Sequence, residues 1–435
     1  MRISVFGCGY LGVTQAACMA ENGHEVVGVD IDVEKVCALS AGRVPFFEPE
    51  LTEVVRRQLA TGRLAFTTST TVAVEHADVH FICVGTPQSA DDFSADMTAV
   101  EVAVRSIVTR VTRPCLIVGK STVPVGTTAS LRRSIQDVGG AAALVRFAWN
   151  PEFLREGHAV QDTLRPDRIV IGVDDVETER TLRHIYEAAI EQGAPVIVTN
   201  FATAELVKTS ANAFLATKVS FINAVADMCD ATGADVVQLA EALGHDTRIG
   251  RRYLHAGLGY GGGCLPKDVR AFMHRAGELR ASEAVRLLRE VDNINQRRRQ
   301  RVVDMASDVL HQVSGSSVGI LGAAFKPHSD DVRDSPALWV AEQLQMMGAT
   351  ITVFDPQAMD NARGLFPTLT YAASAKAACL DADLVLLLTE WPEFAALSPT
   401  VLGDLVARRQ IIDGRNYLDA AQWRAAGWTF RGIGK

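Results

Sequence analysis

One cysteine lies at the end of an unusual run of glycines. Cys264 closes Gly259-Tyr-Gly-Gly-Gly-Cys264 and is followed within four residues by Lys267 and Asp268. Glycine loses much conformational freedom on folding, so we expect such a run where backbone must pass close to a ligand. A nearby cation favours the thiolate, and a carboxylate can orient water or accept a proton. The pattern predicts that Cys264 is a nucleophile, and the alternative is a buried structural thiol.

Two further pairs of polar residues could serve the same chemistry. Glu152 and Glu156 lie four residues apart just after a predicted strand, and they share one face if the segment is helical. Lys208 and Asn212 have the same spacing within an apolar helical stripe, where a buried lysine needs a partner. A carboxylate could act as a base, and a cation or amide could stabilise an oxyanion. Each pair, taken alone, could equally consist of solvent-exposed residues with no catalytic role.

A glycine motif near the N-terminus predicts a dinucleotide site. The sequence Gly7-Cys-Gly9-Tyr-Leu-Gly12 follows a predicted strand and opens an apolar helix, and the next strand ends at Asp30. Gly7 permits a tight turn, Gly9 lets the backbone approach a pyrophosphate, and Gly12 allows close helix packing. Asp30 would bind the ribose hydroxyls and repel a 2′-phosphate, which favours NAD over NADP. The alternative is a tight turn between strand and helix that binds nothing.

Two other loops fall where open parallel sheets bind ligands. Val84-Gly-Thr-Pro ends one predicted strand, and Lys120-Ser-Thr-Val-Pro-Val-Gly-Thr follows another. They place the hydroxyls of Thr86 and Thr122 at that edge, unless the loops only turn the chain.

A nucleophilic cysteine beside an NAD site has one clear use. An alcohol oxidised to an aldehyde can be captured as a thiohemiacetal, which loses a second hydride to become a thioester. Water then hydrolyses the thioester to a carboxylate. The residues therefore predict a four-electron oxidation that consumes two NAD per substrate.

The elements that position these residues alternate in a regular way. Short apolar runs separated by periodic helical segments predict βαβ units with a parallel sheet. The runs are Ile3–Phe6, Glu25–Val29, Val79–Val84, Cys115–Gly119, Arg146–Trp149, Arg168–Val173 and Pro195–Thr199, then Val318–Leu321, Thr350–Phe354, Leu384–Leu388 and Gln410–Ile412. Residues 202 to 306 show helical spacing alone, and Ser282 to Leu310 predicts a long connecting helix. Its triple arginine, 297–299, is expected on a solvated face.

The second alternating region resembles the first. Val318-Gly-Ile-Leu-Gly followed by a helix and Thr350-Ile-Thr-Val-Phe-Asp355 repeats the pattern of the N-terminal unit, without its glycine triplet. The fold class expected is α/β, with two Rossmann-like doubly wound parallel-sheet domains joined by a central all-helical domain. We expect an N-terminal NAD-binding domain at 1–200, a helical domain carrying the cysteine at 201–313, and a C-terminal domain at 314–435 that binds a different ligand.

Composition excludes several classes of protein. The chain has 435 residues, 48% of them hydrophobic, and a net charge of −8. This is ordinary globular composition. The negative net charge argues against a protein whose main function is to bind nucleic acid. No run is long enough to span a membrane, no signal peptide is evident, and the scattered cysteines fit neither disulfides nor a metal site. We expect a cytoplasmic protein that binds no metal, membrane or nucleic acid.

Together these motifs resemble the UDP-glucose/GDP-mannose dehydrogenase family of nucleotide-sugar 6-dehydrogenases. The resemblance spans nearly the whole chain. It rests on G-C-G-Y-L-G at Gly7, V-G-T-P at Val84, K-S-T-V-P-V-G-T at Lys120, N-P-E-F-L-R-E-G at Asn150, A-E-L-V-K at Ala204, D-T-R-I-G at Asp246, G-Y-G-G-G-C-L-P-K-D at Gly259 and F-K-P-x-x-D-D-x-R-D-S-P at Phe325. It implies oxidation of UDP-glucose at C6, with GDP-mannose or UDP-N-acetylmannosamine as alternative substrates.

The resemblance also implies a role for individual residues. The catalytic group is Cys264, Lys208, Asn212, Asp268, Thr122 and Glu152. The NAD group is Gly7, Gly9, Tyr10, Leu11, Gly12, Asp30, Lys35, Thr86, Thr122, Glu156, Lys267 and Arg333. The sugar-nucleotide group is Glu152, Phe153, Leu154, Arg155, Glu156, Lys208, Asn212, Arg248, Tyr253, Leu254, His255, Ala256, Gly257, Gly261 and Lys326. Arg248 resembles an arginine that family members reach across a dimer interface, and Arg415 is expected to join it.

Two other functions remain open at this point. A two-electron hydroxyacid dehydrogenase would release one NADH per substrate and would leave Cys264 structural. A silent nucleotide-binding scaffold would show no turnover at all. The long apolar faces of the helical block favour a homodimer.

Overall fold

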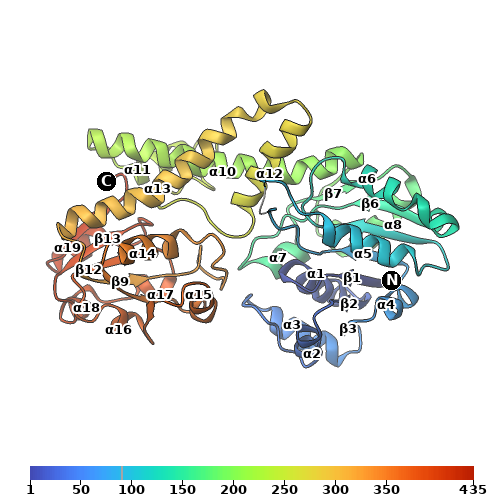
Figure 1. Ribbon diagram of the computed structural model, residues 1–435, viewed down its shortest axis with the longest axis horizontal. Helices are drawn as coiled ribbons and strands as arrows, with labels where there is room; N and C mark the ends of the chain where they lie inside the picture. The colour runs from blue at the N-terminus through green and yellow to red at the C-terminus, as the bar shows by residue number, and fades with distance from the viewer. Residues whose placement is uncertain (90–91) are drawn as a thin grey trace. The chain divides into compact units, whose positions relative to one another are not determined.

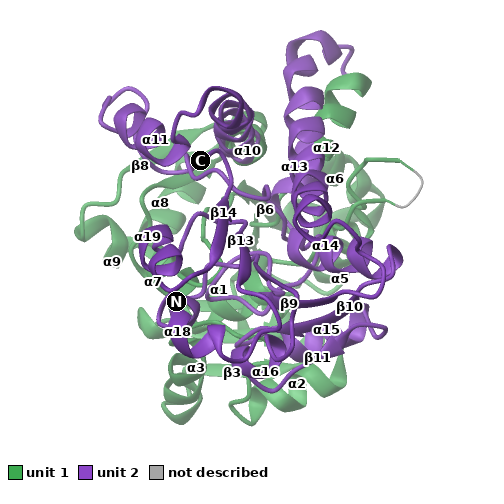
Figure 2. Ribbon diagram, turned by 90° about the vertical axis from the view of Figure 1, so that its left-hand side faces the viewer, with its two compact units in different colours: residues 1–211, 270–278 green, residues 212–269, 279–435 purple. Residues whose placement is uncertain are grey.

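The structure of the protein is a computed structural model, and residues 1–89 and 92–435 of it are described (Figure 1). The chain divides into two compact units, which are coloured in Figure 2. Unit 1 comprises residues 1–211 and 270–278, and unit 2 comprises residues 212–269 and 279–435. The sequence predicts a different division, into residues 1–200, 201–313 and 314–435, and this division stays a prediction.

Unit 1 is built on one eight-stranded sheet. The strands are β1 (Arg2–Phe6), β2 (Glu25–Val29), β3 (Leu64–Thr67), β4 (Val79–Ile82), β5 (Cys115–Gly119), β6 (Val145–Trp149), β7 (Ile169–Gly172) and β8 (Val196–Thr199). Their order is β3-β2-β1-β4-β5-β6-β7-β8, and every pair is parallel except β6 with β7. The central strands are continuous apolar runs because helices cover both faces, and all of β4 and β5 is buried. The first six strands have the order of a dinucleotide-binding sheet, which places ligands at the carboxyl ends of β1 and β4.

The helices of unit 1 follow the strands in alternation. They are α1 (Tyr10–Glu21), α2 (Val33–Ser40), α3 (Leu51–Ala60), α4 (Thr70–His76), α5 (Thr98–Val108), α6 (Thr127–Ser134), the 3-10 segment Gln136–Leu144, α7 (Ala159–Leu164), α8 (Val176–Ile185) and α9 (Glu187–Glu191). Helix α1 is buried along most of its length, from Gly12 to Ala20. Its N-terminus is thereby fixed against the end of β1.

The middle of the chain is helical, as the spacing of its apolar residues predicts. It contains α10 (Phe201–Thr232), α11 (Val236–Gly244), α12 (Leu265–Glu278), the 3-10 turn Ser282–Val285 and α13 (Arg286–Leu310). Helix α10 has 32 residues and contributes to both units, as does α12. The helix expected from Ser282 therefore begins at Arg286, after one 3-10 turn.

Unit 2 contains a second sheet with the order of the first. Its strands are β9 (Ser317–Leu321), β10 (Thr350–Phe354), β11 (Thr370–Tyr371), β12 (Leu384–Leu387), β13 (Gln410–Asp413) and β14 (Thr429–Gly432). The order is β11-β10-β9-β12-β13-β14, and all pairs are parallel. Its helices are α14 (Pro336–Met346), α15 (Met359–Leu365), α16 (Ala375–Ala378), α17 (Pro392–Ala395), α18 (Pro399–Gly403) and α19 (Ala420–Ala425). The repeat seen in the sequence is thus a repeat of one fold, and the α/β class with two Rossmann-like sheets is confirmed.

The triple arginine of α13 is not a solvated face, and that expectation is wrong. Arg297 is exposed and pairs with Glu290, but Arg298 and Arg299 are 2% and 3% exposed. Consecutive helical residues point about 100° apart, so a run of three cannot occupy one face. Burying a guanidinium requires a partner, and these two pair with Asp227 and Asp334.

Membrane spans, metal clusters and disulfides are all missing from residues 1–89 and 92–435. None of their helices has the length and apolar character needed to cross a membrane. They contain no group of three or more His, Cys, Asp or Glu side chains that could hold a metal ion. No cysteine forms a disulfide, and only Cys37 and Cys264 are exposed.

Candidate active site

The glycine loop of unit 1 has the geometry of a phosphate site. Gly7 has a φ of +93°, and a Cβ there would lie 2.8 Å from the backbone of Val84. A Cβ on Gly12 would lie 1.7 Å from the Gly7 carbonyl oxygen, whereas one on Gly9 would meet no atom within 4 Å. Within the described residues no side chain caps the N-terminus of α1. Its first N–H groups and the positive end of the helix dipole therefore suit a pyrophosphate.

Asp30 directly follows β2, beside this loop. Its Oδ2 accepts hydrogen bonds from the Cys8 N–H at 2.8 Å and from Lys35 Nζ at 3.2 Å, and its Oδ1 accepts one from the Asp32 N–H at 3.0 Å. Burial raises the pKa of Asp30, but the hydrogen bonds and the Lys35 charge outweigh it, so the pKa lies below its usual value. The ionised carboxylate fits two ribose hydroxyls, and these residues therefore fit NAD.

The two threonine loops meet at the carboxyl edge of the sheet. Thr86 donates a hydrogen bond from Oγ1 to the Thr122 carbonyl oxygen at 2.8 Å. Ser121 donates to the Val84 carbonyl oxygen at 2.7 Å. The loop after β4 and the loop after β5 are therefore joined, and both predicted residues lie at the edge where the sheet binds its ligand.

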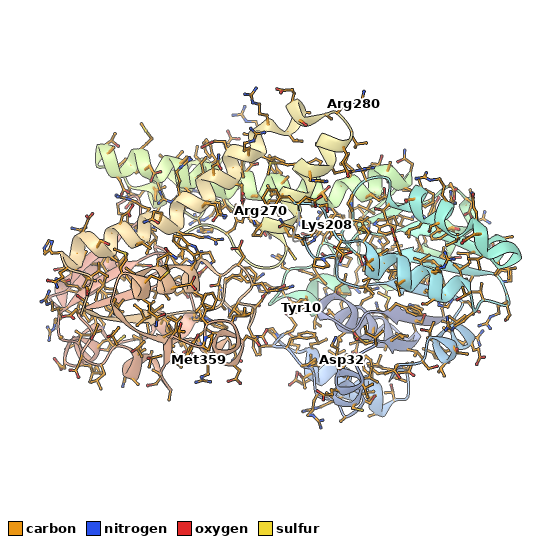
Figure 3. The ribbon with its side chains drawn as sticks, in the orientation of Figure 1. Tyr10, Asp32, Lys208, Arg270, Arg280 and Met359 are labelled. Atoms are coloured by element: carbon orange, nitrogen blue, oxygen red, sulfur yellow. The ribbon has the colours of Figure 1, made fainter. Side chains whose placement is uncertain are left out.

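Lys208 of α10 pairs with Glu152, and both are nearly buried. Lys208 Nζ lies 2.9 Å from Glu152 Oε1, with side chains 8% and 12% exposed. The ammonium also lies 5.6 Å from the centre of the Phe153 ring. Figure 3 labels Lys208 on its helix. A buried lysine and a buried carboxylate stabilise each other's charge, so the pair can hold or move a proton near a bound alcohol.

The segment that carries Glu152 is a loop, so the helical face expected for Glu152 and Glu156 does not exist. Residues 150–158 contain neither helix nor strand. Pro151 has no N–H to continue a helix, and Glu152 Oε2 instead accepts the Leu154 N–H at 2.7 Å. Arg155, expected at the sugar nucleotide, pairs with Asp162 at 2.7 Å.

Glu48 holds the end of this loop and was missed by the sequence analysis. Its carboxylate is 5% exposed and accepts the N–H groups of Gly157 at 2.6 Å and Ala159 at 2.7 Å. It also accepts a short hydrogen bond from the Tyr10 hydroxyl at the start of α1. The signal available was an acidic residue directly before a proline, in Phe46-Phe47-Glu48-Pro49.

Glu205 was also missed, although it lies one turn before Lys208. It is 2% exposed and accepts the N–H groups of Gly126 at 2.6 Å and Thr128 at 2.7 Å, at the N-terminus of α6. The Thr128 hydroxyl adds a third hydrogen bond at 2.6 Å. Glu205 thus fixes the end of the loop that begins at Lys120 against α10.

Unit 2 presents the cysteine at the start of a helix. Cys264 is exposed and directly precedes α12, and its carbonyl oxygen accepts the Asp268 N–H at 2.9 Å. The N-terminus of a helix favours negative charge, which suits a thiolate. The alternative of a buried structural thiol does not describe this position.

Asp268 lies in the first turn of the same helix and is almost fully buried. It is 2% exposed, and its two oxygens accept hydrogen bonds from Asn212 Nδ2 at 2.6 Å and Lys267 Nζ at 2.7 Å. Three of the predicted residues are therefore brought together on α10 and α12. Lys267, the cation expected near the Cys264 thiol, thus forms an ion pair with the Asp268 carboxylate.

The glycines before Cys264 are required by close packing within unit 2. We expected its glycines to admit a ligand, but each of them faces another segment of unit 2. A Cβ on Gly259, Gly261, Gly262 or Gly263 would lie 2.4, 2.4, 2.8 and 2.4 Å from atoms of Asn295, Asp334, Phe325 and Arg333, respectively. The run therefore packs on the F-K-P-x-x-D-D-x-R-D-S-P segment and on α13. Arg333, predicted for NAD, lies against the residue before the thiol.

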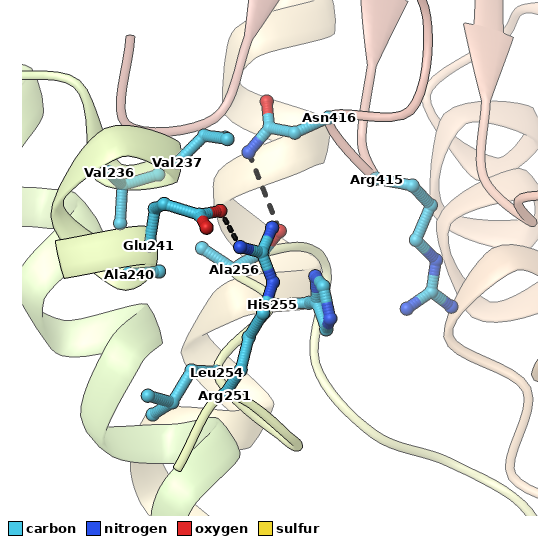
Figure 4. A pocket seen from close by; sticks show the side chains of 10 residues that line it. All are labelled: Val236, Val237, Ala240, Glu241, Arg251, Leu254, His255, Ala256, Arg415 and Asn416. Atoms are coloured by element: carbon cyan, nitrogen blue, oxygen red, sulfur yellow. Dashed lines mark hydrogen bonds and ion pairs between the residues drawn. The ribbon is translucent and has the colours of Figure 1, made fainter. Parts of the chain in front are cut away.

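The loop expected to hold the sugar nucleotide lines a pocket (Figure 4). The pocket is formed by Val236, Val237, Ala240, Glu241, Arg251, Leu254, His255, Ala256, Arg415 and Asn416. Three of these, Leu254, His255 and Ala256, belong to the predicted sugar-nucleotide group, and Arg415 was expected to join Arg248. Arg251 forms an ion pair with Glu241, and Asn416 donates a hydrogen bond to the Ala256 carbonyl oxygen at 3.5 Å. Arg415 Nε lies 3.2 Å from Glu390 Oε2, so both arginines of the pocket pair with carboxylates of the protein.

Other predicted sugar-nucleotide residues lie outside that pocket. Arg248 is 87% exposed and pairs with Asp246 at 2.6 Å. Lys326 lies with its ammonium 5.2 Å from the centre of the Phe325 ring. Tyr253 has a φ of +65° and Gly261 packs on Asp334. The structure thus gathers only part of the predicted set in one cavity.

The second sheet cannot repeat the ribose site of the first. Asp355 directly follows β10, as Asp30 follows β2, but Asp355 is 1% exposed. One oxygen accepts hydrogen bonds from the Ala323 and Ala324 N–H groups and from Trp391 Nε1, at 2.8 to 3.1 Å. The equivalent carboxylate is therefore already saturated, and the second sheet must bind its ligand differently.

Comparison with known proteins agrees with this geometry. Residues 1–190 match the NAD binding domain of the UDP-glucose/GDP-mannose dehydrogenase family, residues 202–297 its central domain and residues 319–420 its UDP binding domain. The chain is 40% identical to a UDP-glucose 6-dehydrogenase of Rhizobium meliloti, with all of both chains covered.

Two solved structures are also similar over the whole chain. One is a UDP-glucose dehydrogenase from Pyrobaculum islandicum, with a TM-score of 0.90, 39% identity and 98% of that chain covered. The other is a UDP-D-ManNAc dehydrogenase from Pyrococcus horikoshii, with a TM-score of 0.85, 27% identity and 99% of that chain covered. With its glycine loop, its helix-start thiol and these matches in all three regions, the chain belongs to the UDP-glucose/GDP-mannose dehydrogenase family.

Proposed function

We propose that this enzyme oxidises C6 of UDP-glucose with NAD and yields UDP-glucuronate. The observation that carries the proposal is the exposed Cys264 thiol at the start of α12, in a chain that also holds an NAD loop. Two relatives that match over the whole chain, from Rhizobium meliloti and Pyrobaculum islandicum, are named for UDP-glucose. A two-electron dehydrogenase would have no use for this thiol.

The first oxidation converts the C6 alcohol to an aldehyde. NAD supplies the hydride acceptor for each of the two oxidation steps. The alcohol proton must leave as the hydride departs, and we assign its removal to the Glu152–Lys208 pair, directly or through a water. Thr122, at the edge of the same sheet, would position that water.

The second oxidation runs through the cysteine. The Cys264 sulfur adds to the aldehyde carbon and forms a thiohemiacetal, whose oxyanion Lys208 and Asn212 are proposed to stabilise. Loss of a second hydride gives a thioester, and Asp268 would activate the water that releases the carboxylate and regenerates the thiol. Asp268 is suited to this task because Asn212 and Lys267 hold it in one orientation. The balance is one water consumed and two NADH formed per sugar.

UDP-glucose is favoured over the other nucleotide sugars. The chain is 39% identical to the structure named for UDP-glucose and 27% identical to the one named for UDP-D-ManNAc. A direct test is NADH formation with UDP-glucose, GDP-mannose and UDP-N-acetylmannosamine at equal concentrations. We expect UDP-glucose to give the highest kcat/KM, and faster turnover of either of the others would overturn the assignment.

Replacing Asp30 by alanine should weaken NAD binding selectively. The substitution removes the acceptor for the ribose hydroxyls, and we expect KM for NAD to rise roughly 10- to 100-fold, since hydrogen bonds to a charged group contribute about 1.5–3 kcal/mol. KM for UDP-glucose should stay nearly constant. Asp360→Ala, at a side chain that is 98% exposed, is the matched control. Equal rises in both KM values would refute the ribose role.

A homodimer is the proposed assembly. Phe214, Phe221 and Met228 lie seven residues apart on α10 and are 65%, 52% and 64% exposed. A seven-residue repeat puts them on one face of the helix, and an exposed apolar stripe of this kind indicates a protein interface. Light scattering should give twice the chain mass of 46.9 kDa. Phe221→Glu should lower the mass toward one chain, Leu380→Glu should not, and a wild-type mass of one chain would contradict the dimer.

The enzyme is proposed to act in the cytoplasm. Its mechanism needs a reduced thiol and a supply of NAD, and none of its cysteines forms a disulfide. Cell fractionation tests this, and activity confined to a secreted fraction would refute it.

A further inference from the structure

The backbone that leads to Cys264 is held by a buried asparagine of α13. Asn295 Oδ1 accepts a hydrogen bond from the Tyr260 N–H at 2.8 Å, and its Nδ2 donates one to the Tyr260 carbonyl oxygen at 2.9 Å. The side chain is 0% exposed. One amide thus forms both hydrogen bonds that a paired β-strand would offer this residue. Tyr260 lies four residues before the thiol.

Other side chains of unit 2 hold the same short segment. Asn223 of α10, also 0% exposed, accepts the Gly257 N–H at 2.9 Å. Arg415 donates to the Gly259 carbonyl oxygen at 3.3 Å, and Arg299 to that of Tyr260 at 3.3 Å. Residues 257–260 form no helix or strand. Their backbone groups therefore depend on side chains for hydrogen bonds, and Asn295 binds both the N–H and the carbonyl group of Tyr260.

Asn295 and Gly259 fit each other closely. Gly259 has a φ of +91°, and a Cβ on it would lie 2.4 Å from Asn295 Oδ1. The asparagine therefore occupies the space that any other residue at 259 would need. This contact explains the first glycine of the run without a bound ligand.

We propose that Asn295 is a positioning residue for the reaction of Cys264. Asn295 acts through the Tyr260 backbone. By fixing that backbone, it sets the position of the glycine run and therefore of the Cys264 thiol at the start of α12. The inference rests on the proposed function, because it assigns the loop to the cysteine-dependent oxidation. Glycines 261 to 263 pack on the segment from Phe325 to Asp334, and the Gly262 N–H donates to the Arg333 carbonyl oxygen at 3.0 Å. Asn295 thus fixes the N-terminal side of a run whose other side is held by that segment.

Asn295→Asp tests this role with almost no change in volume. Aspartate keeps an acceptor for the Tyr260 N–H but offers an oxygen to the Tyr260 carbonyl, where asparagine offers a donor. We expect kcat to fall roughly 10²-fold, the loss associated with a misplacement of about 1 Å. KM for NAD should change little, because the glycine loop and Asp30 belong to unit 1 and the substitution touches neither Lys267 nor Arg333. Amide hydrogen exchange in the peptide covering 257–264 should become faster, with other peptides unaffected.

Asn293→Asp is the matched control on the same helix, since Asn293 is exposed. It should leave kcat, KM and exchange at wild-type values. Gly259→Ala disturbs the same contact from the opposite side, and we expect it to reproduce the loss of kcat and the faster local exchange. Two independent variants thus report on one contact.

The proposal is overturned if Asn295→Asp behaves like Asn293→Asp. It is equally overturned if kcat and KM for NAD worsen together, or if exchange rises throughout the protein, because either would mark a general structural role. Exchange requires no substrate. Faster local exchange in an enzyme that proves inactive on every nucleotide sugar would therefore refute the proposed function and leave the anchor intact.

Discussion

Cys264→Ser will abolish formation of UDP-glucuronate. A hydroxyl at this position is a far weaker nucleophile than a thiolate, so the aldehyde is not captured and no thioester forms. We expect the rate of acid production to fall on the order of 10³-fold or more, the scale observed when a catalytic nucleophile is removed. At most one hydride per sugar should be transferred. Product analysis by chromatography, with NADH read at the same time, measures both effects.

Cys37→Ser provides the control for this experiment. Cys37 is the other exposed cysteine and lies on α2 of unit 1. Its replacement should leave acid production intact. Binding of NAD and UDP-glucose to Cys264→Ser, measured by calorimetry, should remain near wild type. Full acid production by Cys264→Ser would remove the cysteine from the mechanism.

Lys208→Met should have the second largest effect. The substitution keeps the apolar stem of the side chain and removes the ammonium that pairs with Glu152. A group that stabilises a developing oxyanion contributes roughly 10²–10³-fold to kcat, and we expect a loss of that size. Lys376→Met, at an exposed lysine of α16, should have no effect.

A double-mutant cycle extends the test to the pair. Glu152→Gln and Lys208→Met should together cost much less than the sum of their separate effects in free energy, because each removes the same interaction. The variants are compared by steady-state kinetics with saturating NAD. Fully additive losses in free energy would show that Glu152 and Lys208 act independently. That result would contradict a shared role in proton removal.

The parts of this molecule that follow from local pattern were predictable. The glycine loop follows β1 and Asp30 follows β2, with only α1 and its flanking turns between them, so local spacing placed both at one edge of the sheet. Cys264, Lys267 and Asp268 were found because they are neighbours in the chain. The repeat of the βα pattern likewise predicted a second sheet.

Other features depend on geometry that the local pattern does not carry. Strand β11 has only two residues, and β3 and β14 bury only one and two of their four residues, so none of the three gives a continuous buried apolar run. The antiparallel pairing of β7 depends on the direction in which the chain returns to the sheet. Glu152 and Glu156 fail to share a helix because one side chain hydrogen bonds with the local backbone.

The buried residues that hold the site escaped prediction for a related reason. Glu48 binds backbone more than a hundred residues away, and Glu205 and Asn295 also bind segments distant in the chain. Nothing in the sequence around them marks those partners. The same holds for Arg298 and Arg299, whose carboxylates come from α10 and from the loop before α14. Only the assembled units reveal which polar residues are buried.

The number of NADH molecules formed per sugar tests the central claim most directly. With limiting UDP-glucose and excess NAD, the absorbance of NADH at completion is compared with the amount of UDP-glucuronate produced. We predict two NADH for each UDP-glucose consumed, with no aldehyde accumulating. One NADH per sugar, with the aldehyde as the final product, would contradict the account.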